Sequence, residues 1–556
     1  MDTGALSGRK RRKRLEEARL KALTLVFGLA FLFFVGLFVR YQIVGPLQRE
    51  KFVLPAFSQR QKGVAVSLPR GNVLDRQGVP LNQPTWGYAL VALPSETGNS
   101  EQARDTVASV LGHASYTGPP LPSRGESPRV IAQDLDAEQL SRALLAGAEA
   151  PVAVVPIERR YGPRSLARHV VGYVKANAYT DRADNIGETG LERRFQAELV
   201  GEVSSWVGIV ATGEGSDVPG TGLRIGADRA QPADLVTTLD AFIQRETEAV
   251  LDEFGVRRGA AVVLDVASGD VLAMASRPQF DQGHPEASMD DPDAPFVNRA
   301  VSAFPPGSVF KPVIMSFALD RGYVSKDEVF HCKGQVTVGG RTIACGNTKE
   351  GHGEVTPKEA LAYSCNSTLI QIGLRLDPVE LIEYVRQCGF GVLTGIPLDE
   401  ETTGTLPDPF RMYAGDLANF SIGQGYLTVT PLQVAAFYRA IATGGLYTRP
   451  RLVLSDPASV PVRIFSQDTA EFLQSALLSA TREGTATLAW VPVLGSAGKT
   501  GTAETGGQGF PSHAWFCGWT PILAPRYVIC VFVEGGGDGP SVACPIFRAI
   551  ASRIQH

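Results

Sequence analysis

Three patterns of apolar residues follow one another along the 556-residue chain. Residues 23–39 form an uncharged apolar run, LTLVFGLAFLFFVGLFV, whose length is near the lower limit for a helix that crosses a bilayer. From residue 41 to about residue 235, short apolar runs alternate with Gly, Pro and polar segments, which is typical of an extended platform. Beyond that point the runs acquire helical or strand periodicity. We therefore expect a domain boundary just before residue 236.

The C-terminal part begins with signals for a helix and a hairpin. Asp240 can cap a helix that ends near Gly255, because apolar residues recur at helical spacing between them. Residues 259–276 contain two β-type runs joined by Ala-Ser-Gly-Asp, which predicts a hairpin. A second strand pair, at 513–520 and 526–535, follows a long block of helical patterns. This order predicts an α+β fold with an antiparallel sheet packed between helices.

The charge distribution separates the N-terminus from the rest of the chain. The net charge is −4, but residues 1–21 carry eight Lys/Arg and three Asp/Glu, which leaves 45 basic and 54 acidic residues, or −9, in the remainder. An acidic body argues against nucleic-acid binding. The basic run KRRKR, at 10–14, is instead interpreted as the positive flank of a membrane anchor, which should stay in the cytoplasm.

A cleaved signal peptide is the alternative to an uncleaved anchor. Its apolar part would normally be shorter than residues 23–39, and the following segment RYQIVGPLQRE, at 40–50, offers no small-residue cleavage site. We therefore expect a single-pass membrane protein in which residues 1–22 are cytoplasmic and everything after Arg40 lies outside.

The first candidate chemical motif is FPPGSVFKP, at 304–312. Two prolines and a glycine end the preceding element, so a helix that begins at Ser308 would carry Lys311 on the same face. A hydroxyl beside an amine is a possible nucleophile and base. The spacing alone is weak evidence, because about 0.7 matches to S-x-x-K are expected by chance in this composition.

The second and third motifs are short. Thr356 begins a capping-box pattern for a helix whose end delivers Ser364, Cys365 and Asn366. S-x-N is also common by chance, and serine and asparagine occur near helix ends for structural reasons. The run GSAGKTGTAET, at 495–505, is more specific, since the chain has few lysines and a glycine inside a strand often marks close approach of another backbone or a ligand.

The three motifs together, in this order, match the set found in penicillin-binding proteins and class A β-lactamases, although the middle element is usually written S-D-N. The chain resembles a class B penicillin-binding protein, a membrane-anchored D,D-transpeptidase of peptidoglycan synthesis, over nearly its whole length. The segments that carry the resemblance outside the motifs are residues 68–81, 167–174, 187–201, 264–276, 298–312, 420–445 and 513–521.

The resemblance implies four parts. Residues 1–22 are a cytoplasmic basic tail, 23–39 a transmembrane anchor, 40–235 a pedestal of the penicillin-binding protein dimerisation type, and 236–556 a transpeptidase domain. It also implies, as partners, peptidoglycan stem peptides, β-lactam antibiotics and a multi-span glycan polymerase of the SEDS type in a bacterial cell membrane.

The resemblance also assigns roles at the expected catalytic centre. Ser308 is the nucleophile that attacks the D-Ala-D-Ala bond, and Lys311 is its base if burial and the positive charge of Lys499 lower its pKa. Ser364 relays a proton to the leaving amine, and Asn366 holds the substrate amide and orients Lys311. β-Lactams should acylate Ser308, and no metal or organic cofactor is required.

Substrate binding is expected at the third motif. The hydroxyls of Thr500 and Thr502 would bind the terminal carboxylate, with Gly501 between them and positive charge from Lys499. The N–H groups of Ser308 and Thr502 would form the oxyanion hole. His513 follows this strand, but such a lone histidine is more often structural than catalytic.

The seven cysteines all follow residue 330. Cys332 and Cys345 flank a Gly-rich, hairpin-like stretch where a disulfide is plausible in an exported protein. His331 and His352 lie nearby in sequence, but neither C-x-x-C nor H-E-x-x-H occurs, so no metal site is expected.

Two classes of alternative function remain open. A serine β-lactamase would share the nucleophile and lysine but needs a base for water, which the sequence does not reveal. A non-catalytic scaffold or β-lactam sensor is the other alternative, and a sensor should carry a cytoplasmic signalling domain or several spans. Division, elongation and sporulation roles are not distinguished.

Overall fold

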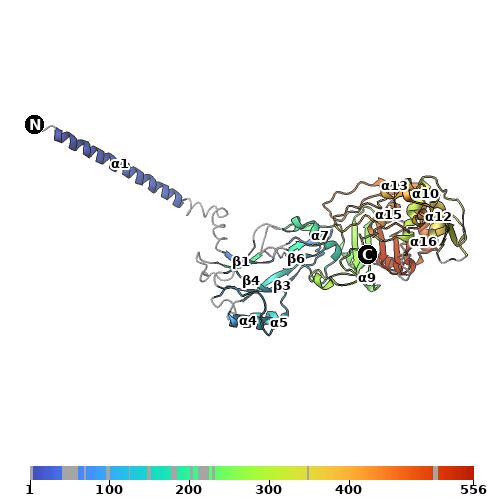
Figure 1. Cartoon of the computed structure of the whole chain (residues 1–556), viewed down its shortest axis with the longest axis horizontal. Coiled ribbons are helices and arrows are strands. Elements are labelled where there is room, and N and C mark those ends of the chain that lie inside the picture. The colour runs from blue at the N-terminus through green and yellow to red at the C-terminus, as the bar shows by residue number, and fades with distance from the viewer. Residues whose placement is uncertain are drawn as a thin grey trace. The chain divides into compact units, whose positions relative to one another are not determined.

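The structure is a computed structural model, and the chain folds into two compact units (Figure 1). One comprises Met1–Val66, Gly87–Ile157 and Ser205–Ala227, and the other comprises Ser67–Trp86, Glu158–Ser204 and Asp228–His556. The residues that the structure describes are 4–39, 61–67, 70–95, 100–123, 126–146, 152–176, 185–200, 205–210, 224–227, 232–346, 348, 350–504 and 511–555.

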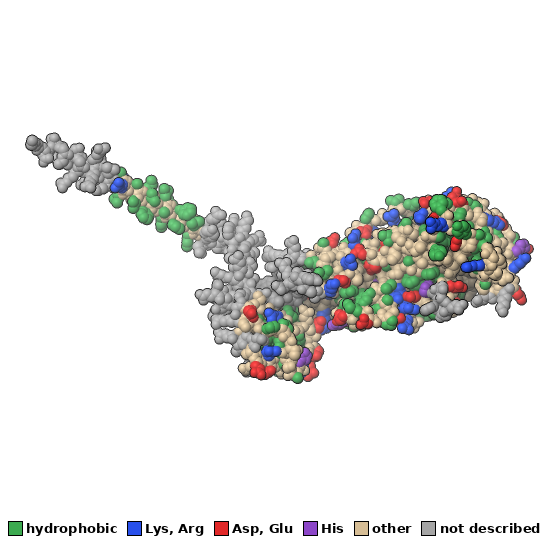
Figure 2. Space-filling model, in the orientation of Figure 1, with side chains coloured by type: hydrophobic (Ala, Val, Ile, Leu, Met, Phe, Trp, Pro, Cys, Tyr) green, Lys and Arg blue, Asp and Glu red, His purple; other side chains and the backbone are tan. Residues whose placement is uncertain are grey.

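The first unit contains the N-terminal helix α1, Gly4–Val39. Its segment Ala18–Val39 is long and apolar enough to cross a membrane. Apolar side chains cover this part of α1 in the space-filling view (Figure 2). The helix is a candidate membrane span, in agreement with the predicted anchor at 23–39. The absence of a cleavage site was argued from residues 40–50, which lie outside the described residues.

Among the described residues, the rest of the first unit consists of two small sheets and two helices. In one sheet β3 (Thr85–Ala92) lies between β4 (Arg129–Ala132) and β5 (Val152–Arg159). Apolar residues of β3 alternate between a core that contains α4 (Glu101–Leu111) and α5 (Ala137–Ala146) and a smaller cluster on the opposite face. The other sheet has the order β1 (Gln61–Ser67), β8 (Ser205–Val210) and β9 (Arg224–Ala227).

A five-stranded antiparallel sheet forms the centre of the second unit. Its order is β12 (Val271–Arg277), β11 (Gly259–Asp265), β21 (Tyr527–Val533), β20 (His513–Thr520) and β19 (Ala497–Ala503). Both predicted hairpins are confirmed. The chain forms β11 and β12 first and returns to the same sheet only after the helical block.

Alternation along the strands builds a core on each face of this sheet. Val528, Cys530 and Phe532 belong to one apolar cluster, whereas Ile529 and Val531 belong to the other. Because every second side chain faces the opposite side of a strand, a continuously apolar strand is buried on both faces. Helix α15 packs on the first face, and α9 and α17 pack on the second. The α+β prediction is confirmed.

The helices of the second unit are α6 (Arg168–Val171), α7 (Gly190–Arg194), α8 (Gln196–Leu199), α9 (Ala241–Glu253), α10 (Lys311–Asp320), α11 (Pro357–Ala362), α12 (Asn366–Gly373), α13 (Pro378–Gln387), α14 (Ala414–Ser421), α15 (Pro431–Ala442), α16 (Gln467–Arg482) and α17 (Cys544–Arg553). Its short strands are β2 (Val73–Leu74), β6 (Val174–Ala176), β7 (Asn185–Gly187), β10 (Leu235–Val236), β13 (Phe330–Cys332), β14 (Gln335–Val338), β15 (Arg341–Ala344), β16 (Gly353–Val355), β17 (Leu446–Tyr447) and β18 (Val462–Arg463). Asp240 caps α9 through its side chain, as predicted.

Two segments from the predicted pedestal lie in this second unit. Strand β2 pairs in parallel with β10, and the Asp75 carboxylate accepts a hydrogen bond from the Ala241 N–H at 3.0 Å. The fully buried Glu192 carboxylate lies between Arg70 and Arg160, each at 2.5 Å. Charges this deeply buried require partners, so these segments are fixed where they lie. The domain boundaries at 40 and 236 stay predictions.

Candidate active site

Ser308 and Lys311 lie at a junction between two kinds of helix. Residues Gly307–Phe310 form a 3₁₀ turn, closed by a hydrogen bond from the Lys311 N–H to the Ser308 carbonyl, and α10 begins at Lys311. The predicted helix is therefore present, but its first turn, which contains Ser308, is 3₁₀, and the α-helix starts only at Lys311. Pro312 has no N–H to donate, so regular α-helical bonding starts later. Residues three apart eclipse in a 3₁₀ turn, which still places both side chains on one side.

The Lys311 side chain is completely buried and joins the first motif to the second. Its Nζ donates to the Ser364 carbonyl at 2.6 Å and to the Asn366 Oδ1 at 2.6 Å, and it lies 3.2 Å from the Ser364 Oγ. Burial lowers the pKa of Lys311 from its usual 10.5 to about 8, while the neighbouring Cys365 and Cys345 thiols act in the opposite direction.

Ser364 occupies an unusual backbone conformation between two helices. Helix α11 ends at Ala362 and α12 begins at Asn366, so the predicted helix is shorter than the sequence pattern indicates. Ser364 has φ +59°, which is rare for a residue with a side chain. Such a conformation costs on the order of 1–3 kcal/mol and is retained where the surroundings fix it. Here it directs both the carbonyl and the hydroxyl of Ser364 at Lys311.

Lys499 lies on β19, an edge strand of the sheet, and is also completely buried. Its Nζ lies 3.3 Å from the Thr500 carbonyl and 3.4 Å from the Thr500 Oγ1. Burial first, and then the charge of Lys311, lower the pKa of Lys499 well below its ordinary value. Two amines in one buried site disfavour the state in which both are charged.

Glycines allow the first and third motifs to approach each other. A Cβ on Gly307 would lie 2.5 Å from the Thr502 carbonyl oxygen, and one on Gly501 would lie 2.8 Å from the Pro306 oxygen. Gly423 has φ +76°, and its Cβ would lie 2.0 Å from the Gly307 oxygen. The Gly307 N–H also donates to the Gly423 carbonyl at 2.9 Å. The glycine in the K-T-G strand thus permits close backbone contact.

The eight predicted site residues therefore come from three neighbouring places: the turn before α10, the connection between α11 and α12, and strand β19. These residues are Ser308, Lys311, Ser364, Asn366, Lys499, Thr500, Gly501 and Thr502. Their catalytic and binding roles stay predictions. Thr502 has one contact that the sequence did not predict, because its Oγ1 accepts a hydrogen bond from the Gly539 N–H at 3.2 Å.

The family of the chain follows from comparison with known proteins. Residues 259–552 match the family described as "Penicillin binding protein transpeptidase domain", and residues 65–211 match the "Penicillin-binding Protein dimerisation domain". The chain belongs to the penicillin-binding protein transpeptidase family. The transpeptidase match includes all three motifs and the five-stranded sheet, and the dimerisation match adds the pairing of domains that is typical of class B.

Individual relatives agree with this family. The chain is 29% identical to "Stage V sporulation protein D" of Bacillus subtilis, over 86% of this chain and 76% of that protein. It is 26% identical to "Peptidoglycan D,D-transpeptidase MrdA" of Escherichia coli K12, over 89% and 88%. A chain in the structure "Structural coordination of polymerization and crosslinking by a peptidoglycan synthase complex" is 28% identical, with TM-score 0.71 and coverage of 96% and 98%.

These matches confirm the predicted class B penicillin-binding protein and its function as a D,D-transpeptidase of peptidoglycan synthesis.

His513, which follows the K-T-G strand in sequence, makes contacts that are typical of a structural histidine. Its Nδ1 accepts the Gly535 N–H at 3.0 Å, and its ring packs edge-on against Phe304 and Phe532. Burial lowers the pKa of His513, so the neutral ring is favoured.

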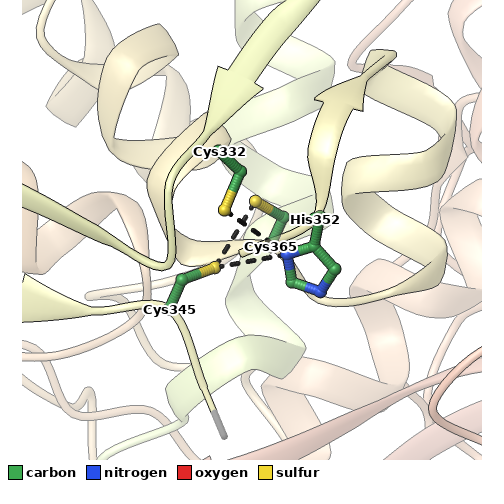
Figure 3. A group of neighbouring side chains, drawn as sticks. All are labelled: Cys332, Cys345, His352 and Cys365. Carbon is green, nitrogen blue, oxygen red and sulfur yellow. Dashed lines mark hydrogen bonds between the residues drawn. The ribbon is translucent and has the colours of Figure 1, made fainter. Parts of the chain in front are cut away.

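The four side chains of Cys332, Cys345, His352 and Cys365 form a cluster beside the second motif (Figure 3). Both Cys332 and Cys345 are free thiols in the structure, so it does not contain the expected disulfide between them. The prediction treated these two cysteines as a pair. His352 was noted near them in sequence, but nothing indicated that Cys365, the middle residue of S-x-N, joins the group, in which all donor atoms lie within 4.8 Å of one another.

The glycine contact at residue 423 generates a prediction. Gly423→Ala should slow labelling of the protein by a fluorescent penicillin at least about tenfold, because the new Cβ must displace the turn that carries Ser308. The measurement is the initial labelling rate of detergent-solubilised full chain. Gly415→Ala is the matched control, since a Cβ at Gly415 in α14 has no neighbour within 4 Å. A folded Gly423→Ala protein that labels at the wild-type rate would contradict the prediction.

Proposed function

We propose that this chain cross-links peptidoglycan through an acyl-enzyme on Ser308, with Lys311 as the base. One observation carries the proposal. The fully buried Lys311 amine is held between the carbonyl and hydroxyl of Ser364 and the amide of Asn366, one 3₁₀ turn from Ser308. A serine hydroxyl needs such a base to act as a nucleophile near neutral pH.

In the acylation step, neutral Lys311 takes the Ser308 proton while the Oγ forms a bond to the carbonyl carbon of the penultimate D-alanine. The C–N bond to the terminal D-alanine then breaks. The proton passes from Lys311 through the Ser364 hydroxyl, 3.2 Å away, to the departing amine. An acceptor amine of a second stem peptide then attacks the ester, the amide cross-link forms, and Ser308 recovers its proton.

The terminal carboxylate of the stem peptide would lie against Thr500 and Thr502 on β19. Gly501 keeps the strand free of a side chain between them. A bound carboxylate opposes the effect of burial on Lys499 and favours its ammonium form, so substrate binding itself would supply the positive charge. The oxyanion would lie at the N–H groups of Ser308 and Thr502, and such donors typically contribute several kcal/mol to the transition state.

The proposal extends to topology and partners. The basic residues before Ala18 would keep the N-terminus in the cytoplasm and place the transpeptidase domain outside. A multi-span glycan polymerase is the proposed partner. Support comes from the similar chain in a peptidoglycan synthase complex that combines polymerization and crosslinking.

The nucleophile is tested by the time course of labelling. Wild-type full chain should form a long-lived covalent adduct with fluorescent penicillin that survives denaturation, and Ser308→Ala should form none. Rapid loss of label with continued antibiotic consumption would instead identify a serine β-lactamase. Wild-type protein that is folded and never labels would leave only the scaffold.

The base is tested by the pH dependence of the same reaction. Lys311 acts in its neutral form, which dominates above a pKa of about 8. The second-order acylation rate constant should therefore rise about tenfold per pH unit below that value and level off above it. The acylation rate constant of wild-type protein is measured from pH 6 to 9.5. A rate constant that is independent of pH or falls with pH would contradict Lys311 as the base. Lys311→Arg, which stays charged, should be inactive throughout.

We further propose that Cys332, Cys345, His352 and Cys365 hold a structural Zn²⁺, where the sequence pattern predicted no metal. The Cys332 Sγ and the Cys345 Sγ each lie 3.5 Å from the His352 Nδ1, and the Cys345 Sγ lies 3.5 Å from the Cys365 Sγ. Donor atoms at Zn–S and Zn–N distances around a tetrahedral ion are separated by about 3.5–3.8 Å. A disulfide would instead bring two sulfurs to about 2 Å.

The chemistry of the cluster also suits a closed metal site. Three thiols and one imidazole fill all four positions of a tetrahedral ion, which is typical of a structural centre. The hydrogen bond between the two thiols lowers the pKa of Cys345 and raises that of Cys365, so one thiol of the pair is favoured as the thiolate that binds metal. Asn366 also donates to the Ala344 carbonyl at 3.1 Å, so the ion would fix the segment against which Asn366 rests.

The metal proposal is tested by elemental analysis. Full chain purified under reducing conditions without chelator should contain about one zinc per chain. His352→Ala and Cys345→Ser should lose it, and Cys388→Ser, which removes another buried thiol, should keep it. Cobalt substitution should give the visible absorption of a tetrahedral thiolate centre. Metal-free protein in which mass spectrometry finds Cys332 bonded to Cys345 would overturn the proposal.

A further inference from the structure

One threonine outside the three motifs contacts two of them. Thr485 follows α16, and its N–H donates to the Ala362 carbonyl at 3.1 Å. Ala362 is the last residue of α11, two positions before Ser364. The Thr485 hydroxyl lies 3.0 Å from the Thr500 Oγ1 and 3.5 Å from the Ala362 oxygen. A single side chain thus connects the end of α11 with the strand that carries K-T-G.

The local backbone fixes Thr485 in this place. A Cβ on Gly484 would lie 2.3 Å from the Ala362 oxygen and 2.8 Å from the Ala480 Cα. Only glycine therefore fits at this position of the turn. On the preceding turn, Thr481 donates its hydroxyl to the Ser496 carbonyl at 2.6 Å, next to the start of β19. The end of α16 is therefore bound to α11 and to the start of β19 by contacts that do not involve the Thr485 side chain.

The hydrogen-bonding capacity of Thr500 gives this contact a role. A hydroxyl has one proton to donate and two lone pairs that accept. The Thr485 hydroxyl has one proton and two acceptors within reach, the Ala362 oxygen at 3.5 Å and the Thr500 Oγ1 at 3.0 Å, and the shorter contact favours Thr500. In that arrangement the Thr500 Oγ1 accepts from Thr485 and, at 3.4 Å, from the Lys499 Nζ. With both acceptor positions filled, its single proton must point elsewhere. Under the proposed function, the substrate carboxylate bound at Thr500 and Thr502 accepts that proton.

We infer that Thr485 is a positioning residue, which turns the Thr500 hydroxyl toward the carboxylate of the substrate or the β-lactam. The inference rests on the proposed function, because it requires a carboxylate bound at Thr500. Thr485 does not touch the reacting atoms. Without its hydroxyl, the Thr500 proton is free to turn toward other acceptors, and part of the bound carboxylate's hydrogen bonding is lost.

The experiment compares benzylpenicillin with benzylpenicillin methyl ester, in which the carboxylate is blocked. The second-order acylation rate constant of full chain is measured for both. Thr485→Val should react with benzylpenicillin about tenfold more slowly than wild type, the size expected for one hydrogen bond to a charged group. Its rate with the ester should be unchanged. Thr485→Ser, which restores the hydroxyl, should return the benzylpenicillin rate to within about twofold of wild type.

Two further variants separate positioning from damage to the fold. Thr481→Val removes a buried hydroxyl of α16 that contacts neither Thr500 nor Ala362, so the ratio of the two rates should stay at the wild-type value. Thr500→Val should lower the benzylpenicillin rate, and adding Thr485→Val to it should cause no additional loss. If Thr485→Val does not fold, Thr485→Ala replaces it, since the backbone contact to Ala362 remains.

The inference is overturned if Thr485→Val slows both reagents equally, if Thr485→Ser fails to rescue, or if the double variant loses rate additively. Failure of the proposed function gives a different result, because wild-type protein would then not be acylated by benzylpenicillin at all. That outcome overturns both proposals together.

Discussion

Oxygen atoms of a single short segment surround the amine of Lys311, and much of the site follows from that burial. The amine is completely enclosed, so it must be hydrogen-bonded, and it finds its partners on Ser364 and Asn366. Those partners require α11 to stop and α12 to start within a few residues, with a strained serine between them. The same burial lowers the pKa of Lys311, so that part of the amine is neutral near physiological pH. Folding and chemistry thus depend on one desolvated group.

The sheet supplies the second fixed element of the site. Strand β19 is an edge strand, so its free side can face a ligand while β20 holds its other side. Packed cores on both faces of the sheet keep the strand rigid. Glycines let the backbone of the turn that carries Ser308 contact the backbone of this strand directly. The arrangement is tight because backbones, not long side chains, form the contacts between the first and third motifs.

The sequence predicted features that depend on local chemistry. The sequence predicted the helix caps at Asp240 and Thr356, both hairpins and the composition of the three motifs. Caps, turns and strand periodicity depend on neighbouring residues, so they can be recognised without the fold. The sequence did not reveal that the helix begins with a 3₁₀ turn, because the missing N–H of Pro312 changes the hydrogen bonding of the residues before it. The cluster around Cys365 and the contact of Thr485 were missed because their members meet only through the fold. The spacing of Cys332, Cys345 and His352 follows no short pattern.

The second unit is discontinuous along the chain, and this has a consequence for how it is made. Asp75 meets the start of α9 across 166 residues, and Arg70 meets Glu192 across 122. Between them lies Gly87–Ile157, which belongs to the other unit and is in effect an insertion. During synthesis β2 cannot pair with β10, and Asp75 cannot reach α9, until Gly87–Ile157 and Ser205–Ala227 of the other unit have both emerged. Contacts between residues so distant in sequence slow folding, so the second unit should form its core only late in synthesis.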